Sequence, residues 1–154
     1  MTNAMENVKK FNVRVYGICF NERQEILVTD EIVKGREITK FPGGGLEFGE
    51  GTIDCIKREF VEETEQEVEV VKHFYTTDLF VTSAFHSDQQ VISIYYLVKF
   101  ISEPKFEIKQ KRFDFHERKD DVFVFRWLPL EKIKEEEFTF EIDKKVALLI
   151  RQAF

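Results

Sequence analysis

Cysteine and histidine are scarce in this sequence, and their scarcity excludes several kinds of site. Cys19 and Cys55 are the only cysteines, and both lie in apolar stretches, so the sequence predicts reduced thiols and no disulfide framework. The three histidines, at positions 73, 86 and 116, do not have the spacing of zinc ligands. Because no histidine neighbours Cys55, we interpret that thiol as a packing group and not as a nucleophile. This cysteine usage is typical of a cytoplasmic protein.

Long apolar runs and an excess of basic residues are also missing. No apolar run approaches the roughly 20 residues of a membrane span, and the N-terminus lacks the basic-then-apolar order of a signal peptide. We therefore expect no membrane partner. The formal net charge of −6 argues against stable, sequence-independent binding to nucleic acid. A protein of this charge needs a cation to handle an anionic substrate. The sequence leaves open whether the chain forms a homodimer.

The residues that are present indicate one globular domain, residues 1–154. This length is enough to bury a core, and a chain with 43% apolar and 34% charged residues is of ordinary globular composition. The 17 phenylalanines are many for this length. Most are expected to fill the core, and a few near a cleft could stack on a base.

Residue alternation and turn residues predict a mixture of strands and helices. Strands are expected at 11–20, 25–28, 68–80, 90–101 and 121–127, and polar loops at 29–40 and 102–121. A helix is expected at 52–65 and a short helical turn at 129–134. A closing helix is expected to dock on the sheet through an apolar stripe of Ile142, Val146, Leu149, Ile150 and Phe154. The fold class is therefore α/β, or mixed α+β, with a mixed sheet.

Glycine and glutamate are concentrated in one part of the chain. Five of the seven glycines lie at positions 43–51, where a free backbone and exposed N–H groups suit the approach of a phosphate or metal. Glu59, Glu62 and Glu63 follow at i, i+3 and i+4, which puts three carboxylates on one face of the predicted helix. Such a face alone is more often merely solvated. Combined with the glycine loop, it favours a site for Mg²⁺ or Mn²⁺.

The spacing of these residues resembles the signature of the Nudix hydrolase superfamily. That signature is Gly, five residues, Glu, seven residues, then Arg-Glu-apolar-any-Glu-Glu-any-Gly-apolar. In this chain Gly44 is followed after five residues by Glu50, and seven further residues lead to Arg58 and Glu59. Every charged position of the signature is filled, and the resemblance covers residues 41–66.

The resemblance implies an α/β/α sandwich with a mixed sheet and the metal-dependent hydrolysis of a diphosphate linkage. The catalytic residues that it implies are Glu50, Arg58, Glu59, Glu62 and Glu63. It implies Mg²⁺ or Mn²⁺ as cofactor, held by Glu59, Glu62, Glu63 and the carbonyl of Gly43. Arg58 would orient the carboxylates and reduce their repulsion, and Glu59 is the first candidate for the general base.

The chain departs from the signature at the end of the helix. Glu65 stands where the pattern has glycine, and Gln66 where it has an aliphatic residue. Glycine at this position would supply the left-handed residue that stops the helix. We therefore expect either that the helix runs on or that Gln66 caps it in another way.

A second departure concerns substrate binding. Relatives often carry an arginine near the end of the second strand, where it contacts phosphate, whereas this chain has Thr29-Asp30. Lys34, Arg36 and Lys40 are candidate replacements, although each is also explained as a solvated loop cation. Further cations that could fold over the site are Lys109, Lys111 and Arg112. Relatives also take an acidic ligand or base from a distant loop, for which the candidates are Glu107, Glu117, Asp120 and Asp121.

These features predict a substrate in which a nucleoside diphosphate is joined to another group, as in a nucleotide sugar. The net charge and the missing arginine favour this substrate over a nucleoside triphosphate, which remains the alternative. Two other classes stay open. One is a binding or regulatory module that has lost turnover. The other is an isoprenoid diphosphate isomerase, for which the sequence lacks the required combination of cysteine and histidines.

Overall fold

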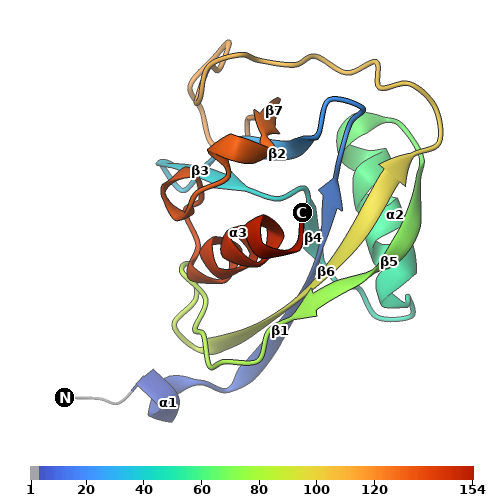
Figure 1. Ribbon diagram of the computed structural model, residues 1–154. Helices are drawn as coiled ribbons and strands as arrows, with labels where there is room; N and C mark the ends of the chain where they lie inside the picture. The colour runs from blue at the N-terminus through green and yellow to red at the C-terminus, as the bar shows by residue number, and fades with distance from the viewer. Residues whose placement is uncertain (1–3) are drawn as a thin grey trace.

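Seven strands in two sheets form the centre of the structure, a computed structural model that describes residues 4–154 (Figure 1). The helices and strands in chain order are α1 (Ala4–Asn7), β1 (Lys10–Cys19), β2 (Glu25–Val33), β3 (Arg36–Lys40), β4 (Gly43–Gly45), α2 (Thr52–Thr64), β5 (Val68–Thr76), β6 (Gln89–Phe100), β7 (Phe123–Pro129), the 3₁₀ turns η1 (Leu130–Lys132) and η2 (Glu135–Glu137), and α3 (Glu141–Ala153).

The larger sheet is mixed, as the sequence predicts. Its strand order is β4-β1-β6-β5, and β1 runs parallel to β6 from the pair Lys10–Gln89 to the pair Cys19–Val98. The smaller sheet, β3-β2-β7, is antiparallel throughout. Figure 1 shows α2 and α3 on opposite sides of β1 and β6, so the expected α/β/α arrangement is confirmed.

Alternation along β1 divides the core into two parts. Val15 and Cys19 belong to a cluster that contains Phe60 of α2, whereas Tyr16 and Ile18 belong to the cluster that contains the buried face of α3. Successive side chains of a strand point to opposite faces of the sheet, so a strand covered on both faces must be apolar on both. The second half of β1 satisfies this requirement, because all its residues from position 15 are buried.

Segment 29–40 is a β-hairpin, and the prediction of a loop there is wrong. β2 continues to Val33, and β3 begins at Arg36. Lys34 and Gly35 between them have φ values of 50° and 77°. Two successive residues with positive φ form the tight turn that matches the twist of a hairpin. The polar composition that indicated a loop has two sources. Glu31, Arg36 and Lys40 line the cleft described below, whereas Asp30 and Thr39 are buried and hydrogen-bonded to each other.

Three short elements, α1, β4 and η2, were not predicted, and the other elements outside the hairpin differ from expectation only at their ends. β5 stops at Thr76 and not at position 80, and β7 begins at Phe123 and not at position 121. The irregular loop 102–121 is confirmed, and it arcs over the top of the molecule in Figure 1. The predicted helical turn after Pro129 is present as η1.

The closing helix docks as predicted. The residues of its stripe that are buried or pack against the core are Ile142, Val146, Ile150 and Leu149. Phe154, which is 49% exposed, places its ring 4.9 Å from that of Phe20. The stripe therefore fixes α3 between the two sheets, where it also forms one end of the cleft.

The end of α2 differs from both expected outcomes. The helix stops at Thr64, and Glu65 itself takes the left-handed conformation, with φ 59° and ψ 21°. Its N–H donates to the carbonyl of Val61 at 2.9 Å. The side-chain amide of Gln66 donates to the carbonyl of Glu103 at 2.9 Å, which ties the helix end to the loop after β6. The helix thus ends where glycine would have ended it, at a conformational cost of about 1 kcal/mol.

Both cysteines are buried and free, which agrees with a packing role. Burial raises the pKa of each thiol to about 12. A thiol that stays protonated at neutral pH is a poor nucleophile. Neither Cys19 nor Cys55 is therefore placed for covalent chemistry.

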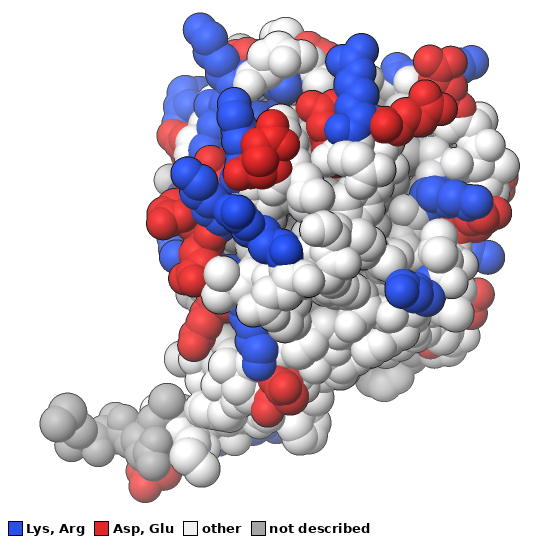
Figure 2. All heavy atoms as spheres, in the orientation of Figure 1, with Lys and Arg blue, Asp and Glu red and all other residues white. Residues whose placement is uncertain are grey.

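Charged side chains are interspersed on the face that Figure 2 shows. Lys and Arg lie among Asp and Glu, mainly over the upper and left parts of the molecule, and the centre of this face carries few charges. Within residues 4–154, no helix combines the length and apolar character needed to cross a membrane.

Candidate active site

Two glycines of the loop before α2 allow unusually close approaches. Gly43 has a φ of 145°, and a Cβ atom there would lie 2.1 Å from the carbonyl oxygen of Val15. A Cβ atom on Gly44 would lie 2.4 Å from Oε1 of Glu59. β4 pairs with β1 at these positions, so the glycine run is fixed as a short strand beside the helix. The carboxylate of Glu59 occupies the space that a side chain at position 44 would fill.

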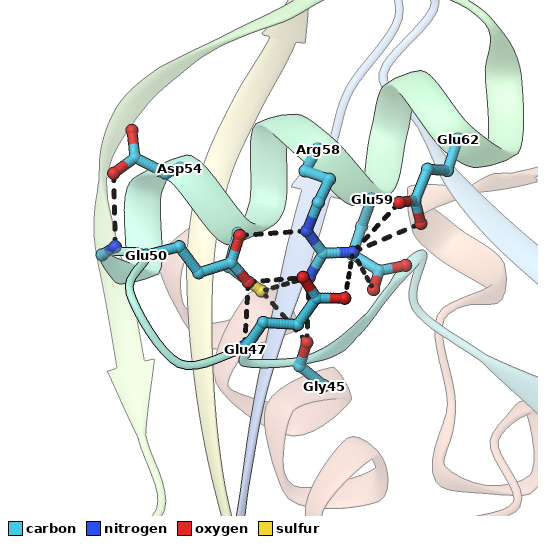
Figure 3. Close-up of polar contacts among 9 residues, drawn as sticks. Gly45, Glu47, Glu50, Asp54, Arg58, Glu59 and Glu62 are labelled. Atoms are coloured by element: carbon cyan, nitrogen blue, oxygen red, sulfur yellow. Dashed lines mark hydrogen bonds and ion pairs between the residues drawn. The ribbon is translucent and has the colours of Figure 1, made fainter.

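Arg58 on α2 gathers the carboxylates around itself (Figure 3). Its Nε and Nη2 donate to the two oxygens of Glu50 at 2.9 and 2.7 Å. Its Nη1 donates to Glu59 at 3.1 Å and to Glu62 at 3.2 Å, and Nη2 also donates to the carbonyl of Gly45 at 3.0 Å. The two-pronged bond to Glu50 uses the planar guanidinium fully. The structure thus brings together four residues that the signature predicts, from the loop and from successive turns of the helix.

Glu50 is an anchor for Arg58. Hydrogen bonds from Arg58, followed by the N–H of Glu47, lower the pKa of Glu50 to about 2. The Glu47 N–H donates to Oε1 of Glu50 at 2.9 Å. Because both oxygens of Glu50 accept bonds from the protein, this carboxylate is ionised and already committed to the loop and the helix.

Glu63 has a different environment from the other carboxylates of the helix. Burial raises the pKa of Glu63 to about 7, and the carboxylates of Glu59 and Glu31 act in the same direction, against Lys40. Its Oε2 is buried and has no hydrogen-bond partner in the described part of the chain. A buried carboxylate oxygen without a partner is costly unless a proton or a cation satisfies it.

The residues fit a divalent cation in chemistry, although the structure does not assemble all of the predicted ligands. Carboxylate and carbonyl oxygens suit Mg²⁺ or Mn²⁺, and Oε2 of Glu63 is available to bind one. Among residues 4–154, however, no group of three or more His, Cys, Asp or Glu side chains is arranged to hold a metal. Glu62 is bound by Arg58 and is 56% exposed, whereas Glu59 is only 14% exposed.

A cleft of about 850 Å³ opens beside Glu59 and Glu63. One wall is the sheet face of Asn12, Arg14, Tyr16, Val91, Ser93 and Tyr95, and the opposite wall is the hairpin face of Glu31, Val33, Arg36, Ile38 and Lys40. Gly43, Gly44 and Gly45 line it next to the carboxylates, and segment 81–86 and residues 139–143 complete it. Glu50, Arg58 and Glu62 are not among its lining residues.

The three cations predicted to bind substrate all line this cleft, but from a hairpin and not from a loop. Lys34 and Arg36 lie over the ring of Phe85, with their charged groups 5.8 and 5.5 Å from its centre. Lys40 is only 7% exposed, and its Nζ donates to the carbonyl of Gly43 at 3.3 Å. Lys40 therefore contacts the carbonyl that the resemblance assigns to the metal.

Of the four acidic candidates in the loop 102–121, one reaches the cleft. Asp121 lines it, and its N–H donates to the carbonyl of Ile32 at 2.8 Å. Asp120 instead accepts the N–H of Gly35 at 2.8 Å. Glu107 and Glu117 form surface ion pairs with lysines of their own loop.

The cations of that loop do not fold over the site. Lys109, Lys111 and Arg112 are not among the residues that line the cleft. Arg112 donates to Thr39 Oγ1 at 3.0 Å and to the carbonyls of η2. The loop is held by Asp30, which pairs with Arg126 at 2.6 Å and accepts the N–H of Phe113 at 3.0 Å. Asp30 is thus a buried anchor and is not among the residues that line the cleft.

Sequence reasoning missed several residues of the cleft. Glu31 lies 3.9 Å from Lys40, and burial, with Asp121 and Glu59, raises its pKa. Asp143, in the first turn of α3, accepts the hydroxyl of Tyr95 at 2.5 Å, and burial raises the pKa of Asp143 to about 7. Arg14 comes from β1. The alternation of β1 was visible in the sequence and placed Arg14 beside Tyr16, but nothing local showed which face met the cleft.

Comparison with known proteins places the chain in a family. The family model described as NUDIX domain matches residues 10–149. A NUDIX hydrolase from Nitrosomonas europaea is similar in structure, with a TM-score of 0.67, 20% identity, and coverage of 92% of this chain and 88% of that one. A MutT protein from Methanosarcina mazei Go1 has a TM-score of 0.66 at 18% identity, covering 94% and 93%. An ADP-ribose pyrophosphatase from Streptococcus suis 89-1591 has a TM-score of 0.59 at 17% identity, with coverage of 92% of this chain and 90% of that one. None of the curated proteins compared gives a match.

The fold and the glutamate helix thus define a protein of the class that cleaves pyrophosphate bonds. The chain belongs to the NUDIX domain family, since the family model covers most of its length. Enzymes of this family generally use divalent metal cations and act on small-molecule, nucleotide-type substrates.

Proposed function

We propose that this protein is a cytoplasmic, Mg²⁺- or Mn²⁺-dependent hydrolase that cuts the diphosphate linkage of a nucleoside diphosphate joined to another group. The observation that carries the metal-dependent reaction is the buried, unpartnered Oε2 of Glu63 beside Glu59 at one end of the cleft. Glu59, Glu62, Glu63 and the Gly43 carbonyl would hold the cation. When bound, the cation neutralises phosphate charge and lowers the pKa of a coordinated water.

The protein's own groups supply positioning and a proton acceptor. Arg58, anchored on Glu50, holds Oε1 of Glu59 at 3.1 Å. No described residue donates a hydrogen bond to Oε2 of Glu59, and we assign this atom to take the proton from the attacking water. The Glu59 side chain cannot move closer to the glycine loop, because its carboxylate already fills the space above Gly44.

The substrate class rests on the composition of the cleft. Phe85 and Phe140 offer aromatic surface for a base, and their rings lie 6.0 Å apart, edge to face. Lys34 and Arg36 already make cation–π contacts with the ring of Phe85. Lys40 is engaged by Gly43, and the loop cations stay outside the cleft. Few cations of the cleft are therefore free to bind phosphate. A substrate with two phosphates and a neutral partner group needs less positive charge from the protein than a triphosphate does.

The experiment that tests this substrate class compares kcat/KM under one condition for ADP-ribose, a nucleotide hexose, and canonical and oxidised nucleoside triphosphates. We expect ADP-ribose or the nucleotide hexose to have the highest kcat/KM. A lead of about tenfold or more for a triphosphate, equivalent to ~1.4 kcal/mol of transition-state binding, would reverse the order and place the protein among nucleotide-pool hydrolases.

An inactive binding module is the alternative of another class, and the departure from the signature at Glu65 is the feature that would favour it. Glu65 was the residue that cast doubt on the helix, yet it takes the conformation of the glycine it replaces. The carboxylates before it keep their contacts with Arg58. Release of a phosphorus-containing product from any member of the panel separates an enzyme from a binder.

A further inference from the structure

Arg14 is a cleft residue whose position has no structural explanation in the fold alone. It lies in the middle of β1, opposite Gly45 of β4, and lines the cleft near Glu59. Its Nε donates to the hydroxyl of Tyr16 at 2.7 Å, which fixes the plane of the guanidinium. Tyr16 is itself buried. The strand and the tyrosine together hold Arg14 in one orientation.

The two terminal nitrogens of Arg14 have no partner within residues 4–154. Neither Nη1 nor Nη2 donates a hydrogen bond to a described residue, and no carboxylate lies within 4.0 Å of the guanidinium. Arg58 and Arg126, by contrast, are each bound two-pronged by a carboxylate. A half-buried guanidinium with four unused N–H groups is costly unless an anion binds there.

The surroundings of Arg14 suit an anion that arrives with the substrate. The Tyr16 oxygen, followed at longer range by Glu59 and Glu31, raises the pKa of Arg14, so its charge is permanent. Lys40 lies over the same Tyr16 ring, with Nζ 5.7 Å from its centre, against 5.8 Å for the guanidinium carbon of Arg14. Lys40 is committed to the Gly43 carbonyl, so Arg14 is the cation of this pair with free donors.

The glycine run gives an anion room to approach. A Cβ atom added to Gly45 would have Nη1 of Arg14 as its nearest neighbour, at 3.6 Å. Nη1 of Arg14 therefore lies beside Gly45, and both residues line the cleft next to the carboxylates. A planar guanidinium can grip two oxygens of one phosphoryl group at once.

We propose that Arg14 is a phosphate-binding residue, which grips the phosphoryl group next to the one held at Glu59 and Glu63. It supplies from β1 the cation that the second strand lacks at Thr29-Asp30. This inference rests on the proposed function, because it places a diphosphate in the cleft. With Arg14 in this role, the negative charge of the substrate is still balanced by a cation although Asp30, in the second strand, is paired with Arg126.

The test compares Arg14→Gln and Arg14→Lys with the wild type and with Arg23→Gln, an exposed turn residue, as matched control. Loss of a two-pronged, charged contact is expected to raise KM about tenfold or more, with a smaller change in kcat. Arg14→Lys should recover only part of the loss, because an ammonium cannot form the fork. Arg23→Gln should behave as wild type. Unchanged KM in both Arg14 variants, with an active wild type, would overturn the inference and leave the proposed function standing.

Binding of methylene diphosphate, measured by titration calorimetry, gives a readout that does not depend on turnover. We expect wild type and Arg23→Gln to bind it, and both Arg14 variants, with melting temperatures like that of wild type, to bind it about tenfold or more weakly. This result would support the phosphate site even if no substrate were hydrolysed and the proposed function failed. Equal binding by all four proteins would overturn the inference. If Arg14→Gln does not fold, Arg14→Lys decides the question.

Discussion

The carboxylate of Glu59 lies in the space left by the missing side chain of Gly44, where a Cβ atom would come within 2.4 Å of Oε1. Gly44→Ala should therefore push this carboxylate aside. Because Glu59 ends in a flexible side chain, the fold should survive with little loss of stability. We expect turnover to fall by about tenfold to a hundredfold, since small displacements of catalytic groups cost this much.

Gly45→Ala is the matched control for the stability part of this prediction, whereas its activity is not a control because position 45 adjoins Arg14 in the cleft. A Cβ atom at position 45 meets nothing closer than 3.6 Å, which is ordinary van der Waals contact. Steady-state kinetics and thermal melting of both variants check the prediction. Wild-type turnover in Gly44→Ala would show that the position of Glu59 does not depend on Gly44.

Divalent metal should raise the melting temperature of the wild-type protein. An ion that binds only the folded state stabilises it by mass action, by ~2.7 kcal/mol at a hundredfold excess over Kd. The double variant Glu59→Gln, Glu62→Gln should lose this response to Mg²⁺ or Mn²⁺. Differential scanning fluorimetry with and without metal measures it. An equal rise in wild type and double variant would mean that the metal binds elsewhere.

Metal-free protein should lose stability as the pH rises from about 4.5 to about 7, because of Glu63. In this window the unfolded chain has released the Glu63 proton and the folded chain still holds it, so the free energy of unfolding falls with pH. The full effect is at most ~3 kcal/mol. Asp143, whose pKa is also raised to about 7, adds a step of the same sign.

Removing the titrating carboxyl should flatten this pH dependence. In EDTA, Glu63→Gln should match the wild type near the acid end of the window and exceed its free energy of unfolding above about pH 7. Asp143→Asn, which keeps an oxygen for the Tyr95 hydroxyl, should remove the second step alone. Denaturant unfolding of each variant across the pH series measures both changes in the free energy of unfolding. A Glu63→Gln curve parallel to that of the wild type would contradict the burial argument.

Replacing Glu65 with glycine should stabilise the protein. Glu65 holds φ at 59°, a left-handed conformation that costs a side-chain-bearing residue about 1 kcal/mol or more. Part of the gain is offset because glycine makes the unfolded chain more flexible. We expect a rise in melting temperature of about 2 °C. Glu67→Gly, two residues away and without positive φ, is the control and should lower the melting temperature. A lower melting temperature in both variants would contradict the claim that the backbone at Glu65 is strained.

The glutamate helix was predictable from the sequence because its geometry is local. Glu50, Arg58, Glu59 and Glu62 lie on one loop and one helix, so their spacing along the chain fixes their contacts in space. The polar hairpin was not predictable from its composition. Its polar residues read as a loop because nothing in the local sequence shows that one face will line a cleft.

Residues that reach the cleft from other elements lay beyond sequence reasoning for the same physical cause. Arg14 meets Gly45 only because β1 and β4 pair, and Glu31 meets Lys40 only because the hairpin forms. Asp143 contacts Tyr95 only because α3 docks on the sheet. Such contacts depend on long-range packing, which the residues of each segment do not encode separately.

The most direct test of metal-dependent diphosphate hydrolysis at this helix is turnover of the best panel substrate by Glu62→Gln and Glu63→Gln, with Mg²⁺ present. Both variants should keep the fold, because each loses a repelling charge on a helix already crowded with carboxylates. Both should lose turnover by about a hundredfold to a thousandfold, as expected when a group that stabilises the transition state is removed. Near-normal turnover in both variants, alongside an active wild type, would show that the reaction takes place without these carboxylates.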